Sequence, residues 1–241
     1  MRSKHEITID VGRGTIGGTL TTPQGASGLV IFAHGSGSSR HSTRNQAVAA
    51  ALNAVGLGTL LIDLLTPEEE AVDLRTREYR FDIPLLASRL TAALDWSRPQ
   101  PALNDLAVGY FGASTGAAAA LILAAQRPDD VRAVVSRGGR PDLAGGALPR
   151  VVAPTLLIVG GADVPVIGMN EDAMRQMRCE VELEIVPAAT HLFEEPGTLH
   201  QVSARAASWF TLHLNPMMDT HPVSQPRADG ASLANPEEQG G

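Results

Sequence analysis

The sequence has little cysteine, few aromatic residues and no long apolar run. Its single cysteine, Cys179, has no second thiol in the chain to pair with, which excludes an internal disulfide and fits a reducing compartment. Aromatic residues make up 4% of the 241 residues, so a core has to be built mainly from Ala, Val, Leu and Ile. No run approaches the ~18 apolar residues that a membrane span needs, and we expect no membrane association.

Positive charge is not in excess either. The chain has 19 Lys and Arg against 26 Asp and Glu, which gives a formal net charge of −7. No basic stripe is interleaved with aromatic residues, so nucleic acid is not an expected partner. Residues 1–6 lead into an alternating segment without the apolar core of a signal peptide. We therefore expect a cytoplasmic protein.

Short apolar segments alternate with helical patterns along most of the chain. Alternating polar and apolar residues over 5–11 and then up to 21 predict two antiparallel strands joined by a turn at Gly12-Arg13-Gly14. Further strands are predicted at 29–33, 57–62, 106–111, 131–136, 155–159 and 181–186, with helices at 43–55, 81–96, 115–127, 169–178 and 196–214. This alternation predicts an α/β fold with a mostly parallel eight-stranded sheet and helices on both faces.

The character of the sequence changes after Asn215. Residues 216–241 are rich in Pro, Gly, Ser, Asn and Asp and show no periodicity, which predicts a disordered C-terminal tail. We find no internal repeat and no sign of a second core before it. The expected organisation is a single domain over residues 1–215 followed by this tail.

A serine stands between a predicted strand and a predicted helix. The segment Gly112-Ala113-Ser114-Thr115-Gly116 follows the apolar strand 106–111 and precedes the small-residue helix 115–127. A turn this sharp exposes the serine hydroxyl, and only small flanking residues avoid colliding with it. Ser114 is therefore a candidate nucleophile.

Two further residues lie where a serine nucleophile needs them. Asp163 follows strand 155–159, and His191 lies in the loop after strand 181–186, so both are expected beyond the carboxyl ends of parallel strands, as Ser114 is. Imidazole can take the serine proton near neutral pH, and a carboxylate on its other nitrogen fixes the tautomer. Asp142, which follows the neighbouring strand, is the alternative for the acid.

Backbone donors for an oxyanion are expected from two places. The N–H of Thr115 begins the helix after Ser114 and gains from the helix dipole. The second donor is expected to be the N–H of Ser36, in the loop His34-Gly35-Ser36-Gly37 after strand 29–33. We expect His34 to shape this loop. Of the remaining histidines, His41, His200, His213 and His221 show no ligand spacing, so no metal is expected, and a serine mechanism needs no cofactor.

Together these motifs make the chain resemble the α/β-hydrolase superfamily, and more narrowly its small dienelactone-hydrolase-like branch. The resemblance covers about residues 5 to 213. It rests on the order Ser114, Asp163, His191 and on the loop containing Ser36. Dienelactone hydrolases proper have a cysteine nucleophile, whereas Ser114 stands here, so the resemblance implies ester hydrolysis without implying lactone specificity. Lids in this superfamily are inserted where this chain has only the short segment 137–154, which implies no lid domain and an open site.

The expected function is cleavage of carboxylic esters with short or soluble acyl groups, a small-molecule substrate. The same acyl-enzyme could instead pass its acyl group to another alcohol or to peroxide, as an acyltransferase or perhydrolase would. A ligand-binding protein without catalysis is the third possibility, because fold does not fix function. The sequence leaves the physiological substrate and the oligomeric state open.

Two groups of charges remain. Arg137 and Arg140 follow strand 131–136, and one of them could bind an anionic part of the substrate, a loop salt bridge being the alternative. Glu68, Glu69 and Glu70, followed by Arg75, Arg77 and Arg80, are interpreted as a solvated face whose charges pair with one another.

Overall fold

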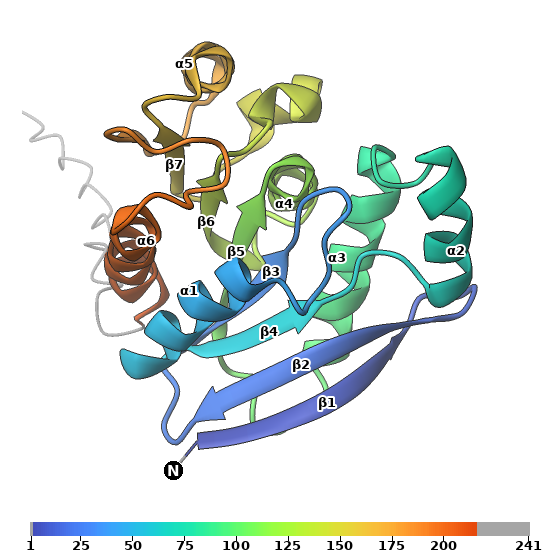
Figure 1. Ribbon diagram of the computed structural model, residues 1–241. Helices are drawn as coiled ribbons and strands as arrows, with labels where there is room; N and C mark the ends of the chain where they lie inside the picture. The colour runs from blue at the N-terminus through green and yellow to red at the C-terminus, as the bar shows by residue number, and fades with distance from the viewer. Residues whose placement is uncertain (1, 216–241) are drawn as a thin grey trace, which may run out of the picture.

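Eight strands form one mixed sheet in the computed structural model of the protein, which describes residues 2–215 (Figure 1). Their spatial order is β1-β2-β4-β3-β5-β6-β7-β8, and only the pairs β1–β2 and β2–β4 are antiparallel. The strands are β1 (Arg2–Asp10), β2 (Thr15–Pro23), β3 (Gly28–Ala33), β4 (Gly58–Ile62), β5 (Ala107–Ala113), β6 (Val131–Arg137), β7 (Thr155–Gly160) and β8 (Val181–Val186). The predicted fold class is confirmed. The predicted tail, 216–241, lies outside the described residues.

Helices cover both faces of the sheet, as the sequence predicts (Figure 1). They are α1 (Thr43–Ala54), α2 (Pro67–Thr76), α3 (Ile83–Ser97), α4 (Thr115–Gln126), α5 (Val164–Gln176) and α6 (Thr198–Leu214), with one 3₁₀ segment, η1 (Pro141–Arg150). On one face α1 and α6 bury an apolar cluster that includes Phe32, Phe111 and Phe210. On the other face α3, α4, η1 and α5 bury a second cluster, which is rich in Ala and Leu. Burial on both faces explains why the central strands are almost entirely apolar.

The helix α2 occupies a stretch for which the sequence analysis predicts only a solvated charged face. Its first turn is fixed by a reciprocal capping box: the Glu69 N–H donates to Thr66 Oγ1 at 3.2 Å, and the Thr66 N–H donates to Glu69 Oε2 at 2.9 Å. Pro67 follows at the first helical position, where its missing N–H costs nothing. The helix has few apolar residues, so periodicity gives no signal, but Thr66-Pro67-Glu68-Glu69 is a recognisable helix start.

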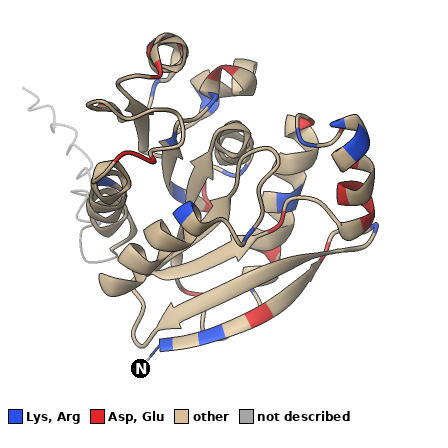
Figure 2. Ribbon diagram, in the orientation of Figure 1, with Lys and Arg blue, Asp and Glu red and all other residues tan. Residues whose placement is uncertain are grey.

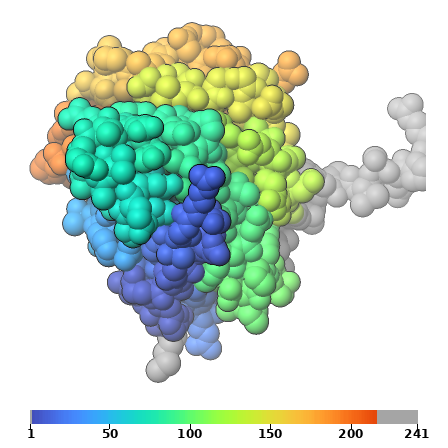
Figure 3. Space-filling view, turned by 90° about the vertical axis from the view of Figure 1, so that its right-hand side faces the viewer, coloured from blue at the N-terminus to red at the C-terminus, as the bar shows by residue number. Residues whose placement is uncertain are grey.

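The expectation that the charges of this segment pair only with one another, exposed to solvent, is wrong for its inner members. Glu69 accepts a hydrogen bond from the buried Arg89 of α3 at 2.5 Å. The buried Asp73 of α2 accepts one from Arg80 Nε at 2.6 Å. Figure 2 shows acidic and basic residues side by side on α2, and Figure 3 shows this teal segment beside the dark blue turn of the β1–β2 hairpin. These pairs therefore fasten α2 to α3 and to the segment that follows α2.

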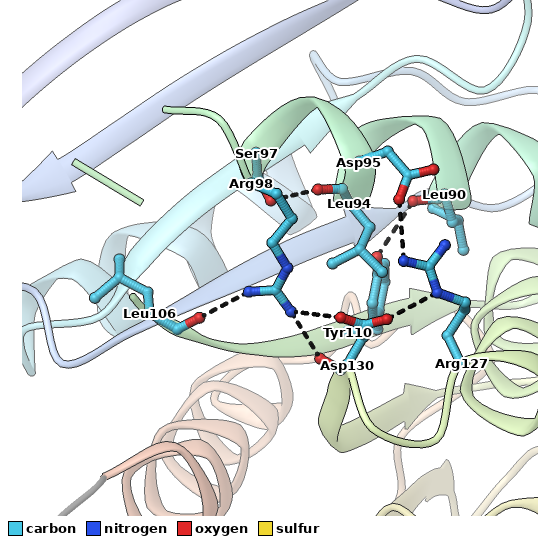
Figure 4. A network of polar contacts seen from close by, with 9 residues as sticks. All are labelled: Leu90, Leu94, Asp95, Ser97, Arg98, Leu106, Tyr110, Arg127 and Asp130. Atoms are coloured by element: carbon cyan, nitrogen blue, oxygen red, sulfur yellow. Dashed lines mark hydrogen bonds and ion pairs between the residues drawn. The ribbon is translucent and has the colours of Figure 1, made fainter. Parts of the chain in front are cut away.

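A second polar network ties α3 to the turn between α4 and β6 (Figure 4). Asp130 accepts hydrogen bonds from Arg98 Nη2 at 3.0 Å and from Arg127 Nε at 2.8 Å, and Arg127 also pairs with Asp95 of α3 at 3.1 Å. Beside it, the buried Tyr110 of β5 donates its hydroxyl proton to the Leu90 carbonyl at 3.2 Å. Arg98 and Asp130 lie next to the starts of β5 and β6, so the network stabilises the end of the sheet opposite Ser114.

The connection between β6 and β7 carries no lid domain in the described part of the chain. It consists of η1, which packs against α4 and α5. The helix predicted at 169–178 begins earlier, at Val164, because Pro165 occupies its first turn, where proline is tolerated. Among residues 2–215, no helix combines the length and the apolar character needed to cross a bilayer.

Candidate active site

Ser114 occupies the turn between β5 and α4 in a conformation that side chains rarely adopt, with φ 50° and ψ −120°. Its backbone is held from three directions. The Ser114 N–H donates to the Arg137 carbonyl at 3.3 Å, and the Ser114 carbonyl accepts from the N–H groups of Ala117 and Arg140, each at 3.1 Å. Strain of this kind persists only where the surroundings fix it, and it is common where a side chain has to be presented for chemistry.

The two glycines of the motif allow this close turn. A Cβ on Gly116 would lie 2.5 Å from the His34 carbonyl oxygen and even closer to that of Ala33. A Cβ on Gly112 would lie 2.7 Å from the Ala117 nitrogen. Both clashes are with backbone, which cannot rotate away, so α4 can pack against β3 and β5 only with glycine at these positions.

His191 and Asp163 meet beyond the ends of β8 and β7. The Nδ1 atom of His191 lies 2.7 Å from Oδ2 of Asp163, the residue that caps α5. In the neutral imidazole this bond places the proton on Nδ1, so that Nε2 is the nitrogen able to accept a proton. His191 and Ser114 line the same cavity. The structure thus brings the three predicted residues to one end of the sheet, while their catalytic roles stay a prediction.

Asp142, the alternative acid, lies in a different environment. Its two carboxylate oxygens accept hydrogen bonds from Arg140 Nε and Nη2 at 2.9 and 2.7 Å. This bidentate ion pair raises the pKa of Arg140. The geometry therefore favours Asp163 as the partner of His191, and for Arg140 it favours the loop salt bridge over substrate binding.

The loop that holds Ser36 is fixed by the buried His34. The Leu64 N–H donates to His34 Nε2 at 3.2 Å, so Nδ1 carries the proton and donates it to the Gly35 carbonyl at 2.8 Å. Burial lowers the pKa of His34, which favours this neutral form. The bonded carbonyl belongs to the same peptide group as the Ser36 N–H, so His34 fixes the orientation of the donor predicted for the oxyanion.

This loop lies against the turn that carries Ser114. A Cβ on Gly35 would lie 3.1 Å from Ser114 Cβ, so the backbone of the loop passes directly beside Ser114. Ser36 is exposed, whereas Thr115, the first residue of α4, is buried with a hydroxyl that has no partner among the described residues. The donor roles of Ser36 and Thr115 stay predictions.

Two cavities flank this turn. The smaller, of about 70 Å³, is lined by leucines that include Leu64 and Leu86, by Thr115, and by the charged residues Asp63, Glu70, Asp73 and Arg80. The larger, of about 210 Å³, holds Ser114 and His191 together with Arg137, Arg44 and Asn45. Ser36 lines both cavities. No three His, Cys, Asp or Glu side chains are grouped as metal ligands would be within residues 2–215.

Sequence reasoning found Arg137 but missed Arg44 and Asn45. Arg137 ends β6, and its position there is visible from the apolar run before it. Arg44 and Asn45 belong to the first turn of α1, far from Ser114 in the sequence, and no motif marks them. Only the packing of α1 against the sheet brings them to the cavity.

Comparisons with known proteins agree with this architecture. The profile of the dienelactone hydrolase family matches residues 16–217. The crystal structure of a dienelactone hydrolase from Anabaena variabilis is 59% identical, with a TM-score of 0.87, over 88% of this chain and 99% of its own. Est1E from Butyrivibrio proteoclasticus shares the fold at 16% identity, with a TM-score of 0.72, over 86% of this chain and 97% of its own.

A relative from Mycobacterium tuberculosis (strain H37Rv) carries a different name, "Putative phosphoribosyl transferase Rv0571c". It is 56% identical over 210 residues, which make up 87% of this chain and 46% of the relative. The chain thus spans about half the length of the curated relatives it matches. More than half of the relative lies outside the match.

Proposed function

Because the chain belongs to the dienelactone hydrolase family, we propose that it is a serine hydrolase that cleaves carboxylic esters through Ser114, His191 and Asp163. The observation that carries the proposal is the 2.7 Å contact between His191 and Asp163 at the cavity that Ser114 also lines. Family membership supports hydrolysis, and the serine at the turn supports an acyl-enzyme on oxygen.

The proposed reaction has two halves. Nε2 of His191 takes the proton of Ser114 as Oγ attacks the acyl carbon, and Asp163 stabilises the imidazolium that forms. The N–H groups of Thr115 and Ser36 stabilise the negative charge on the carbonyl oxygen. His191 then protonates the leaving alcohol, and water, activated by the same imidazole, releases the acid and restores Ser114.

The smaller cavity supports a preference for short acyl groups. Its volume of about 70 Å³ and the leucines in its lining, Leu64 and Leu86 among them, suit a chain of a few carbons. The absence of a lid domain from the described residues leaves no large apolar cover for a long lipid chain. Acetyl to butyryl esters are therefore the proposed range.

The transferase name of the mycobacterial relative does not contradict this proposal. That name describes a protein about twice as long, and the matched part is the one that shares the hydrolase fold. We assign any phosphoribosyl transfer in that relative to the part this chain does not match. The proposal for this chain therefore rests on its own site.

The test is hydrolysis of p-nitrophenyl esters from acetyl to palmitoyl by wild type, Ser114→Ala and Ser208→Ala. Ser208 is the matched control, because its exposed hydroxyl bonds only to its own helix at Ala204. We expect activity on short chains that is lost in Ser114→Ala and kept in Ser208→Ala. A fluorophosphonate should label wild type at Ser114, and the peptide that carries the adduct is identified by mass spectrometry. Activity or labelling that survives in Ser114→Ala would contradict the proposal.

A further inference from the structure

Arg137 carries a positive charge into the interior without a counterion. Only 7% of the residue is exposed, and its Nε has no hydrogen-bond partner among the described residues. No carboxylate of the described residues forms an ion pair with it. Arg140, three residues later, has its own carboxylate in Asp142. The two arginines at the end of β6 therefore differ in whether their charge is matched.

The surroundings disfavour the charge on Arg137. Burial, with a smaller contribution from the nearby Arg44, lowers its pKa to about 10. The ring of Phe193, whose centroid lies 5.8 Å from the guanidinium carbon, offers a weak cation–π contact but no hydrogen bond. A buried cation held in this way is costly for the folded chain alone, which points to a ligand that supplies the missing negative charge.

Other groups of the larger cavity match such a ligand. Arg44 Nε, in the first turn of α1, is also a buried donor without a partner among the described residues. Ser42, the N-cap of that helix, accepts from the Asn45 N–H at 3.3 Å, so its hydroxyl proton can be donated. The positive end of the α1 dipole adds to the field of the two arginines.

No acidic side chain lines this cavity in the described part of the chain. Among the described residues, the one carboxylate paired with either arginine is that of Glu194, which lies 3.1 Å from Arg44 Nη1. The Glu194 side chain is 63% exposed, so this pair lies at the surface and leaves the buried Nε of Arg44 free. The cavity thus has two cations, a helix N-terminus and no negative charge of its own.

We propose that this cavity binds a carboxylate or phosphate group of the ester substrate, with Arg137 as its main ligand and Arg44 and Ser42 as further donors. The proposal rests on the proposed function, because the same cavity holds Ser114 and His191. The anionic group would occupy the larger cavity, while the small apolar part of the ester enters the smaller one. Arg137 thereby determines which esters the site selects.

Binding is tested apart from catalysis, with Arg137→Met, Arg137→Lys and the control Arg140→Met. The melting temperature is measured in inorganic phosphate or succinate against chloride at equal ionic strength. We expect phosphate, succinate or both to stabilise wild type and Arg140→Met but not Arg137→Met, with Arg137→Lys intermediate. Arg137→Met should be more stable than wild type in chloride, because an unmatched buried charge is gone. Equal stabilisation of wild type and Arg137→Met by both anions would overturn the proposal.

Selectivity is tested with pairs of esters in which one member is anionic and the other is neutral. The pairs are 1-acetylglycerol 3-phosphate against 1-acetylglycerol, and p-nitrophenyl hemisuccinate against p-nitrophenyl butyrate. In wild type we expect at least one anionic ester to have the higher kcat/KM, and Arg137→Met to lower that ratio by about 10- to 100-fold, mainly through KM. Which pair responds distinguishes phosphate from carboxylate. A ratio unchanged in Arg137→Met for both pairs contradicts the proposal.

Failure of this inference is distinguishable from failure of the proposed function. If the ratios do not change while Ser114→Ala is inactive, the hydrolase stands and the anion site is wrong. If Ser114→Ala stays active while Arg137→Met abolishes stabilisation by anions, the anion site stands and the serine mechanism is wrong.

Discussion

Asp163 binds His191 Nδ1 through Oδ2 at 2.7 Å, while Asp142, the alternative acid of the sequence analysis, is paired with Arg140. The difference comes from the strand that each acid follows. Asp163 follows β7 and caps α5, which places it beside the loop that carries His191. The same substitution at Asp163 and at Asp142 therefore tests which of the two acids assists His191.

Asp163→Asn should lower kcat for short esters by about 10³- to 10⁴-fold, because the amide presents its N–H₂ to Nδ1 and favours the wrong tautomer. Asp142→Asn should change kcat by less than a factor of about three, since it alters only a surface ion pair. Steady-state kinetics on p-nitrophenyl acetate gives both numbers. The reverse pattern would assign the acid to Asp142.

Gly116→Ala and Gly168→Ala place the same methyl group in two helices, with opposite expected effects. In α4 the methyl meets the carbonyl oxygens of Ala33 and His34, so Gly116→Ala should destabilise by about 1–3 kcal/mol or more. In α5 nothing lies within 4 Å of the new Cβ, so Gly168→Ala should stabilise by about 0.5–1 kcal/mol. Urea unfolding of both variants measures the difference, and equal effects would show that α4 does not need its close approach to β3.

The sequence predicts part of the fold and of the candidate site, and the structure supplies the rest. The order and ends of the parallel strands follow from apolar runs, and they place Ser114, Asp163 and His191 at one edge before any coordinates are known. Hydrophobic periodicity does not predict the helix α2, because its contacts with α3 are made by charged residues, as in the bond between Glu69 and Arg89. The sequence also cannot predict that Arg137 lacks a counterion, because this is visible only when the position of every neighbouring side chain is known.

Stability should fall as the pH drops below about 6.5, because of His34. Burial lowers its pKa, so the unfolded chain binds a proton more readily than the folded one. The two states differ in the number of bound protons only between the folded pKa and the unfolded pKa of 6.5, and stability is lost as the pH falls through this window. The slope from His34 is at most about 1.4 kcal/mol per pH unit. His213, whose pKa burial also lowers, acts in the same direction.

The measurement is the free energy of unfolding between pH 8 and 5 for wild type, His34→Gln and His213→Gln. Each variant should lose the part of the pH dependence that its own histidine contributes. The carboxylates of Asp73 and Asp130 affect the free energy of unfolding only at lower pH. Burial opposes their ionisation, but hydrogen bonds from arginines hold their pKa values below 3.8, so their stabilisation is lost only as the pH falls below about 4. A slope between pH 6.5 and 5 that is identical in all three proteins would refute the assignment to these histidines.

Leu86→Ala should move the acyl preference toward longer chains. Leu86 lines the smaller cavity, so its truncation enlarges the space available to the acyl group. We expect the ratio of kcat/KM for octanoyl over acetyl esters to rise about tenfold. Leu90→Ala is the control, because it removes an equally buried leucine one turn along α3 that does not line the cavity. A similar rise in both variants would mean that general loosening, and not the cavity, sets chain length.

The short η1 connection between β6 and β7 has a kinetic consequence under the proposed function. Lipases with a mobile cover gain activity when substrate aggregates, because an interface holds the cover open. With η1 packed against α4 and α5, the described part of this protein has no such cover to displace. Its rate should follow the concentration of dissolved monomer alone, rising hyperbolically and then levelling off when the ester reaches its solubility limit, with neither a lag nor a jump at that point.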